Sequence, residues 1–382
     1  MTHTEEQAAM LNTVDKIADR FGHTYWLEHA RAGTFPKKLW AELSQAGVMG
    51  LALPERYGGS GLGLFEMALV QERLAERGVP LLLMVVGPGL SLMIMARHGS
   101  QSLKERFLPQ AAQGRKIFCF GITEPNAGSN TLKISTTATA RHGEWIVTGS
   151  KHFVSGADQA DYMLVVSRTA PYQAGRHDTL TLFVVDMTDP RVRLRKQPMH
   201  LLTAEHQFEV VFDDVIVPDA DRIGEVGEGF RYLFDGLNPE RINVAALAIG
   251  MGRRLLDAAV GYASQRQVFS YPIGAHQAIQ HALAEAKIHL ELANLMNHYA
   301  AKCYDRQEDA GGWANMAKVG AVDAALEAAD IAIEVHGGNA FTEDYDLLSQ
   351  WELCRLFKTA PVARELALNY VGEHVLGLPR SR

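Results

Sequence analysis

The sequence is poor in cysteine, with three in 382 residues: Cys119, Cys303 and Cys354. They lie far apart, so they make neither a disulfide framework nor the close spacing of a metal site. Sparse cysteine is typical of a reducing compartment, and the first twenty residues lack the charged start and apolar stretch of a secretory signal. We therefore expect a cytoplasmic protein.

Clusters of positive charge are also scarce, and the formal net charge is -7. The densest basic patch, residues 191–196, alternates Arg with other residues as the solvated face of a strand does. Nucleic-acid binding needs clustered Lys and Arg, so we expect no nucleic-acid partner. Two prolines and two glycines interrupt the long uncharged run at residues 79–96, which predicts a buried helical segment and no membrane span.

No glycine-rich turn follows a first strand, and strands do not alternate with helices. This excludes a nicotinamide-binding doubly wound sheet. Helical spacing of apolar residues marks residues 1–117, short β-branched and aromatic runs mark residues 118–222, and helical spacing returns over residues 223–382. The order predicts an α+β protein with an N-terminal helical domain, a middle β-domain and a C-terminal helical bundle.

The segment from Phe120 to Ser129 reads FGITEPNAGS. Pro, Asn and Gly after a strand turn the backbone sharply and expose N–H groups and the hydroxyls of Thr123 and Ser129. Such a loop suits a polar cofactor, although a surface turn with local hydrogen bonds explains the same residues. A second segment, GSKHFVSG at residues 149–156, is interpreted as another turn between strands, with an aromatic ring and a hydroxyl suited to an isoalloxazine ring.

Together these segments resemble the two FAD-binding motifs of the acyl-CoA dehydrogenases, TEPxAGSD and GxKxWITNG. Three further motifs follow: LPERYGGSGL at 53–62 resembles PExYGGxG, RQVFSYPI at 266–273 with His276 and Gln277 resembles RxxFGxPI and FQ, and EVHGGN at 334–339 resembles QxxGGxG. Five motifs in family order, spread over almost the whole chain, identify it as a member of this family. It departs from the usual residues at Asn130, Phe153, Ser155, Gly156 and Glu334.

The resemblance implies a middle β-barrel-like domain, a C-terminal four-helix bundle, FAD at their junction, and a homotetramer built as a dimer of dimers, or a homodimer. Arg266, Phe269 and Gln277 would reach the FAD of a neighbouring subunit, and a guanidinium suits two pyrophosphate oxygens. Without the family, an ion pair at a helix end explains Arg266 equally well. The residues expected to contact FAD are Phe120, Ile122, Thr123, Ser129, Phe153, Ser155, Arg266, Phe269, His276, Gln277, Glu334, Gly337 and Gly338.

In the family, a carboxylate removes the α-proton of an acyl-CoA, the β-hydride passes to flavin, and a trans-2-enoyl-CoA forms; an electron-transfer flavoprotein accepts the electrons. Many members supply that Glu from a C-terminal YEGT loop, where counting from Gly337 puts Pro361 here. Others supply it at the start of the first C-terminal-domain helix in LxxERL, which LNPERI at 237–242 resembles. We predict Glu240 as the base and Arg241 as its positioning cation, although both also suit a helix start for dipole reasons.

By the same resemblance, Ser129, Asn238 and Arg241 lie on the substrate side, and the acyl tail lies near residues 82–95. In the family, a backbone N–H of the C-terminal loop helps to polarise the thioester carbonyl, and proline has none.

Three alternatives follow from Pro361 and the altered motif residues. In the first alternative, the dehydrogenase chemistry is kept: Ala360 or Val362 supplies the missing N–H, or the flavin ribityl hydroxyl takes a larger part in polarising the thioester carbonyl. In the second alternative, the chain is a family-like flavoenzyme with different chemistry, such as an enoyl-CoA reductase, a nitroalkane oxidase or a monooxygenase. In the third alternative, the chain is a non-catalytic acyl-CoA-binding homologue that retained the fold.

Overall fold

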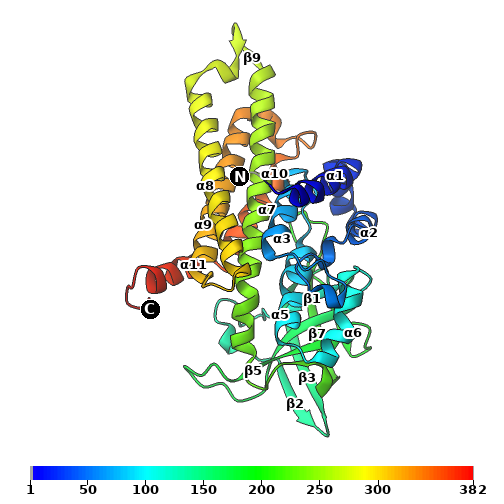
Figure 1. Cartoon of the computed structure of the whole chain (residues 1–382). Helices are drawn as coiled ribbons and strands as arrows, with labels where there is room; N and C mark the ends of the chain where they lie inside the picture. Colours follow the sequence, from blue (N-terminus) through cyan, green and yellow to red (C-terminus); the bar gives the residue numbers. More distant parts are fainter. Residues whose placement is uncertain (1–2, 382) are drawn as a thin grey trace.

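The computed structural model describes residues 3–381, with helices at both ends of the chain and a sheet between them (Figure 1). The N-terminal helices are α1 (Glu5–Ala32), α2 (Lys37–Gln45), α3 (Leu64–Glu76), α4 (Leu82–Val86), α5 (Leu92–His98) and α6 (Gln101–Ala112). The strands are β1 (Phe118–Gly121), β2 (Thr137–Arg141), β3 (Glu144–Ser155), β4 (Tyr162–Arg168), β5 (Leu180–Asp186), β6 (Val192–Lys196), β7 (Gln207–Pro218) and β8 (Arg222–Ile223). The C-terminal elements are α7 (Gly229–Gln265), the hairpin β9 (Gln267–Val268) and β10 (Tyr271–Pro272), α8 (Gln277–Asp305), α9 (Gly311–His336), α10 (Leu347–Thr359) and α11 (Arg364–Tyr370).

The N-terminal helices begin where the sequence supplies caps. Thr4 and Gln7 form a capping box at the start of α1, and the Ser100 hydroxyl accepts a hydrogen bond from the Leu103 N–H at the start of α6. The uncharged run at residues 79–96 forms α4, a π-helical turn at 87–91 and α5, and nearly all of it is buried, as predicted. Among residues 3–381, no helix is both long and apolar enough to cross a membrane.

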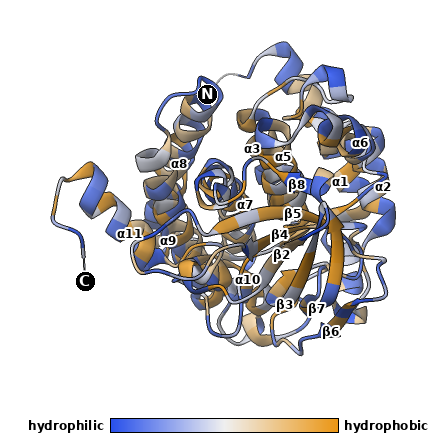
Figure 2. Ribbon diagram, turned by 90° about the horizontal axis from the view of Figure 1, so that it is seen from below, coloured by the Kyte–Doolittle hydropathy of each residue, from blue (hydrophilic) through white to orange (hydrophobic). Residues whose placement is uncertain are grey.

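The middle domain is one bent sheet with the strand order β6-β7-β3-β2-β4-β5-β8, and β1 pairs with β4 in parallel. Side chains from distant strands meet in one core: the ring of Trp145 on β3 lies 5.2 Å from that of Phe183 on β5, and Phe212 of β7 belongs to the same cluster. The sheet therefore curls over its own core, which agrees with the barrel-like domain expected. Figure 2 shows how hydrophobic β4 and β5 are, and β5 is buried from Leu180 to Val185.

The segment at residues 149–156 is not a turn between strands, so that prediction was wrong. Residues 149–155 lie within β3 and Gly156 follows its end; β3 pairs with the twelve-residue strand β7 but shifts register between Val147 and Gly149 and between Lys151 and Val154. Gly149 and Phe153 have φ angles of 144° and 55°, so the turn-forming residues produce bulges and the long partner strand keeps the segment paired.

The C-terminal helices α7 to α10 pack side by side as a bundle, while α11 projects from it at the lower left of Figure 1. The 37-residue helix α7 runs from the sheet to the far end of the bundle. Elements change from helix to strand between Ala112 and Phe118, and back to helix between Ile223 and Gly229. The exact domain boundaries, 117/118 and 222/223, stay predictions.

Candidate active site

The two segments that resemble flavin motifs lie side by side because a buried ion pair joins them. The Lys151 ammonium lies 2.6 Å from the Glu124 carboxylate and donates to the Ile122 carbonyl at 3.3 Å. The His152 N–H also donates to the Thr123 carbonyl at 2.7 Å. Two segments separated by some twenty residues in sequence thus form one surface, as the resemblance implied.

The side chains on this surface differ in what they offer. Phe120 is buried in the core, so only its backbone can face a ligand, whereas Ile122, Thr123 and Ser155 are half-buried. Phe153 has a φ in the left-handed region and its ring is 58% exposed. The side-chain hydroxyls of Thr123 and of the exposed Ser129 make no hydrogen bond to any residue in 3–381, which leaves two donors for a polar ligand.

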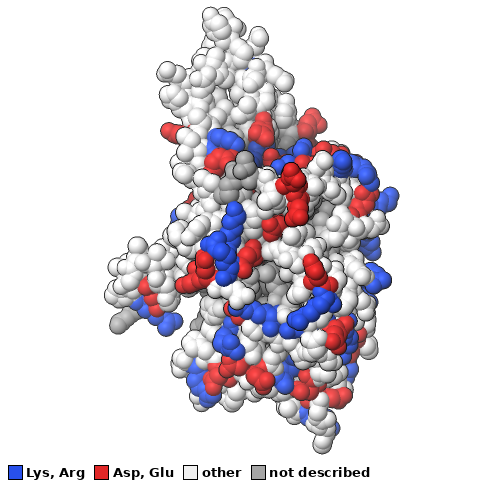
Figure 3. Space-filling model, viewed as in Figure 1, with Lys and Arg blue, Asp and Glu red and all other residues white. Residues whose placement is uncertain are grey.

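The predicted contacts Arg266, Phe269, His276 and Gln277 lie elsewhere, on the hairpin and the start of α8 at the top of Figure 1. All four are exposed, and the Phe269 side chain is 97% exposed. The face drawn in Figure 3 carries almost no charge at this end, although acidic and basic side chains mix over the rest of it. Within one chain, the hairpin lies well away from β1, the strand that carries Phe120 (Figure 1).

Glu334, Gly337 and Gly338 lie at the end of α9, and all are exposed. Gly337 has φ 58° and ψ −133°, a combination that side chains exclude, so glycine is required there. The next residue but one, Asn339, donates from its side chain to the Tyr262 hydroxyl at 3.0 Å, which ties this corner to the last turn of α7. The structure therefore groups these three residues with the hairpin end of the bundle.

Glu240 lies eleven residues inside α7, so the prediction of a helix start at this point was wrong. The helix continues through Pro239 because the carbonyl that this proline cannot serve has another donor: the Tyr304 hydroxyl on α8 donates to the Asp235 carbonyl at 3.0 Å. A helix-terminal dipole therefore does not explain Glu240 and Arg241. Leu237, one turn earlier, packs against the cluster that includes Phe120, which brings this part of α7 to the flavin-like surface.

Glu240 forms a buried charge cluster with Arg241 and with Lys318 of α9. Burial raises the pKa of Glu240 to about 8, although the positive charges of Arg241 and Lys318 oppose that shift. Burial also lowers the pKa of Arg241, and burial together with Arg241 lowers the pKa of Lys318 to about 8. No residue of the described chain donates a hydrogen bond to the Glu240 carboxylate, and the Arg241 Nε is buried without a partner.

Lys318 also holds the loop that contains Pro361. Its ammonium donates to the Val362 carbonyl at 2.7 Å, while the Ala360 N–H is already bonded to the Leu356 carbonyl at 2.9 Å. Of the two neighbours of Pro361, only Val362 therefore keeps an N–H without a partner among residues 3–381. Asn238 accepts from the Arg241 guanidinium at 3.2 Å and so orients it.

Sequence reasoning missed Lys318 and Asn243. Lys318 is the only Lys or Arg in the alanine-rich helix α9, on the face shared by buried Ala314 and Ala321, and a lone Lys at that spacing was the available signal. Asn243 is fully buried one turn beyond Glu240, and neither polar atom of its side chain has a partner within the described chain. It lies against the π-helical turn, because a Cβ on Gly89 would stand 2.5 Å from its Nδ2.

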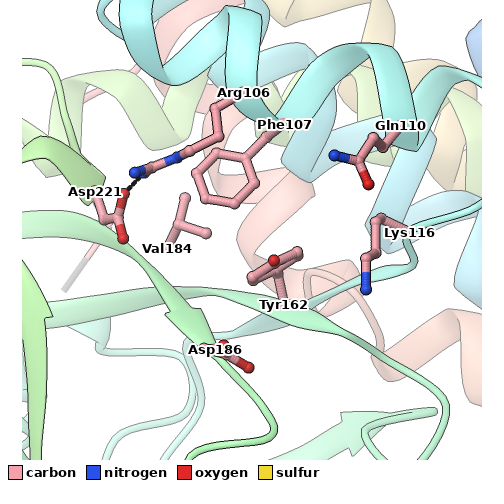
Figure 4. A pocket seen from close by; sticks show the side chains of 8 residues that line it. All are labelled: Arg106, Phe107, Gln110, Lys116, Tyr162, Val184, Asp186 and Asp221. Atoms are coloured by element: carbon pink, nitrogen blue, oxygen red, sulfur yellow. Dashed lines mark ion pairs between the residues drawn. The ribbon is translucent and has the colours of Figure 1, made fainter.

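Figure 4 shows a separate cleft of about 200 Å³ between α6 and strands β4 and β5. Its two basic side chains are already paired, Arg106 with Asp221 and Lys116 with Asp161. None of the predicted site residues lines it. The candidate active site is thus the buried cluster around Glu240 and the adjoining surface, and the cleft lies apart from it.

Three family models match the chain: the acyl-CoA dehydrogenase N-terminal domain at residues 4–115, the middle domain at 119–215 and the C-terminal domain at 227–376. Acyl-CoA dehydrogenase FadE12 of Mycobacterium tuberculosis is 43% identical over 380 residues, which cover 99% of this chain and 98% of that protein. The chain belongs to the acyl-CoA dehydrogenase family.

Solved structures agree with this assignment. Butyryl-CoA dehydrogenase from Megasphaera elsdenii is 28% identical, with a TM-score of 0.94 over 98% of this chain and 99% of that one. A structure described as the electron transferring flavoprotein of Acidaminococcus fermentans is 26% identical, with a TM-score of 0.93 over 98% and 99%. This acyl-CoA dehydrogenase is therefore a flavin-dependent oxidoreductase whose cofactor is FAD, and the predicted three-part fold is confirmed.

Proposed function

We propose that this enzyme oxidises the acyl group of an acyl-CoA thioester to the trans-2-enoyl-CoA, with Glu240 as the base. The observation that carries the proposal is a carboxyl group that is buried, free of hydrogen bonds from the described chain and flanked by two cations. Its pKa of about 8 suits a base that must take a proton from a weak carbon acid near neutral pH. Pro361 at the alternative position of the loop has no carboxylate.

Each residue of the cluster has a separate task. The Glu240 carboxylate takes the α-proton, and the electron pair of that C–H bond moves into the new α,β double bond as the β-hydrogen leaves as a hydride. Arg241, oriented by Asn238, favours the ionised form of Glu240 through its positive charge. FAD, when bound, supplies the two-electron acceptor for that hydride. The unpaired Val362 N–H polarises the thioester carbonyl in place of Pro361.

The residues around Phe153 fit a flavin. An exposed aromatic ring on a bulged strand gives a flat apolar surface, and the backbone from Phe120 to Thr123 with the free hydroxyls of Thr123 and Ser129 provides polar contacts. Ile122 and Ser155 border the same surface, and Ser129 also lies on the substrate side. Strain at Phe153 is common at sites where a side chain must face a ligand.

The hairpin end supports assembly into a homodimer or homotetramer. Phe269, Arg266, His276 and Gln277 are exposed where one chain alone has no flavin surface, so they reach the FAD of a neighbouring subunit. Glu334, Gly337 and Gly338 act at the same end. An exposed apolar stripe on one face of α8 is available for the contact: Ile288, Leu292, Leu295 and Tyr299.

An electron-transfer flavoprotein reoxidises the reduced enzyme, a partner that the family resemblance suggests. The cytoplasm suits the three cysteines, which are buried and form no disulfide within residues 3–381. The acyl tail lies near residues 82–95, where a buried π-helical turn faces α7.

The test is anaerobic mixing of the FAD-loaded enzyme with butyryl-CoA, isovaleryl-CoA, octanoyl-CoA and palmitoyl-CoA, following the visible flavin band and the enoyl-CoA product. Bleaching with enoyl-CoA formation by wild type, lost in Glu240→Gln while FAD and acyl-CoA still bind, supports the proposal. Glu28→Gln on the exposed face of α1 is the matched control and keeps wild-type reduction.

Other outcomes separate the alternatives. Enoyl-CoA reduction without acyl-CoA oxidation points to a reductase, and bleaching by nitroalkanes points to an oxidase. Consumption of oxygen with hydroxylated product indicates a monooxygenase. Binding of acyl-CoA without any bleaching leaves a non-catalytic homologue, and wild-type rates in Glu240→Gln remove Glu240 as the base.

A further inference from the structure

A second buried carboxyl group lies away from Glu240, in the loop between β6 and β7. Glu205 is 1% exposed, and its Oε1 accepts a hydrogen bond from the Leu83 N–H of α4 at 3.1 Å. Its other oxygen, Oε2, is buried and has no partner within residues 3–381. Glu205 therefore links the middle domain directly to the first turn of α4.

The same loop holds the end of β3. The Gly156 N–H donates to the His206 carbonyl at 2.8 Å, and the side chains of Ser155 and Gln207 are hydrogen-bonded at 3.1 Å. Gly156 is packed against Leu83, because a Cβ on Gly156 would stand 2.7 Å from the Leu83 side chain. Residues 205–207 thus fix both the wall of the proposed acyl site on α4 and the strand that carries Phe153 and Ser155.

No charge compensates Glu205. Burial raises the pKa of Glu205 to about 7, and only backbone N–H groups, those of Leu83, Glu205 itself and Leu82, oppose that shift. Helix α4 has no ionisable side chain, and those on the neighbouring strands are already engaged. These engaged pairs are Lys151 with Glu124, His152 with Glu209, and His206 with Lys196.

The neutral and ionised forms of Glu205 therefore differ in effect. The neutral acid fits the apolar surroundings and still accepts the Leu83 hydrogen bond. An ionised carboxylate there is an isolated buried charge, whose cost is relieved if α4 separates from the loop and admits water. Separation moves Leu83 away from Gly156, and with it the contact between α4 and β3.

We propose that Glu205 is a positioning residue that, in its protonated form, docks α4 against the end of β3, and that loss of its proton weakens acyl-CoA binding. This inference rests on the proposed function, because it takes α4 as the wall of the acyl site. Glu205 touches neither Glu240 nor the flavin-like surface, so its effect is on binding and not on the proton transfer itself.

The experiment measures acyl-CoA binding in a background that cannot turn over. The FAD-loaded Glu240→Gln enzyme is titrated from pH 6 to pH 9 with the acyl-CoA of the panel that binds it most tightly, using the shift of the flavin band. If only the protonated form binds, the Kd rises about tenfold between pH 6 and pH 8. Glu205→Gln mimics the neutral acid. When it is added to this background, the Kd no longer rises with pH and stays at the value that the parent has at pH 6.

Glu205→Ala, which loses the Leu83 hydrogen bond, weakens binding several-fold at every pH. Glu28→Gln in the same background is the control and follows the parent curve. Ionisations of CoA itself affect all variants alike, so the difference between the curves reports residue 205. A parent-like rise in Kd with Glu205→Gln, or unchanged binding with Glu205→Ala, overturns the proposal.

Thermal unfolding without any acyl-CoA separates this inference from the proposed function. The pKa of Glu205 is raised in the folded state, so wild-type stability contributed by its proton is lost as pH rises from about 4.5 to about 7. The Tm of Glu205→Gln, relative to wild type, therefore increases from pH 5 to pH 8. If no acyl-CoA binds at any pH, the proposed function fails; a pH-independent difference in Tm overturns the role of Glu205 in either case.

Discussion

Two buried charge clusters in this protein have opposite characters. In the middle domain, Glu124 pairs with Lys151 and accepts further hydrogen bonds from Ser135 and Thr136. Burial alone raises the pKa of Glu124, but Lys151 and these hydrogen bonds outweigh it and hold the pKa at about 2. Glu240 is equally buried, yet no described group donates to it and its pKa is about 8.

The difference shows how a buried carboxyl group that stabilises the fold can be distinguished from one that can take up and release a proton. A carboxylate whose oxygens are all bonded is fixed in its ionised form and cannot take a proton near neutral pH. A carboxyl group left without donors changes its protonation readily in the range where the enzyme works. Both residues are Glu in motifs that resemble the family, so only their surroundings separate their roles.

Removing Glu240 tests the comparison with the largest expected effect. Glu240→Gln lowers the rate of flavin reduction by about 10² to 10⁴-fold, the usual contribution of a general base. Because the folded-state pKa lies above 4.5, the proton bound by the native protein stabilises it less as pH rises from 4.5 to about 8. Glu240→Gln is therefore at least as stable as wild type at pH 8, as measured by denaturant unfolding.

Breaking the structural pair has the opposite result. Lys151→Met leaves Glu124 buried without its cation and lowers the free energy of unfolding by about 3 to 5 kcal/mol. Urea unfolding measures the loss, and the double variant Glu124→Gln/Lys151→Met recovers much of it. A Lys151→Met enzyme with wild-type stability would mean that the pair does not hold the two segments around Thr123 and Phe153 together.

The pH profile sharpens the contrast. Wild-type flavin reduction speeds up as pH rises through about 8, because Glu240 must lose its proton to act as a base. Lys318→Met removes a cation that lowers this pKa, so the midpoint moves up by about one pH unit. Stopped-flow reduction gives both midpoints. Lys287→Met, at an exposed ion pair on α8, is the control and leaves the midpoint in place.

The smallest expected effect concerns Asn243. Its side chain is buried with no partner among residues 3–381, so Asn243→Leu, of similar size, increases the free energy of unfolding by about 1 kcal/mol. Denaturant titration measures the change. A loss of stability on this substitution would show that the Asn243 amide has a hydrogen-bond partner in the FAD-loaded enzyme.

Much of this fold was predictable because its signals are local. Helical spacing and uncharged runs gave the helices, and β-branched runs gave strands β4, β5 and β7. The course of β3 was not predictable, because GSKHFVSG favours a turn locally and only pairing with β7 keeps it extended. The start of α7 was misjudged for a similar reason: Tyr304, 65 residues after Pro239 in the sequence, satisfies the carbonyl that the proline leaves free.

The candidate site was predictable only in part. The motifs predicted Glu240 and Arg241 as site residues. Only the structure showed that both lie inside α7, so that a helix start does not explain them. Lys318 was not predicted, because its link to the site is a contact between α7, α9 and the loop after α10, which are distant in sequence. The contacts of the predicted FAD-binding residues with the cofactor stay predictions.

Helix α7 fixes the distance between Glu240 and Arg266. Glu240 and Arg266, the residue that ends the helix, stand 26 residues apart along it, which at 1.5 Å per residue is about 39 Å. A continuous helix transmits rotation and translation along its length, so a shift at one end reaches the other without passing through a flexible hinge. The helix thus ties the geometry around Glu240 to the hairpin at its far end, which we propose contacts a neighbouring subunit.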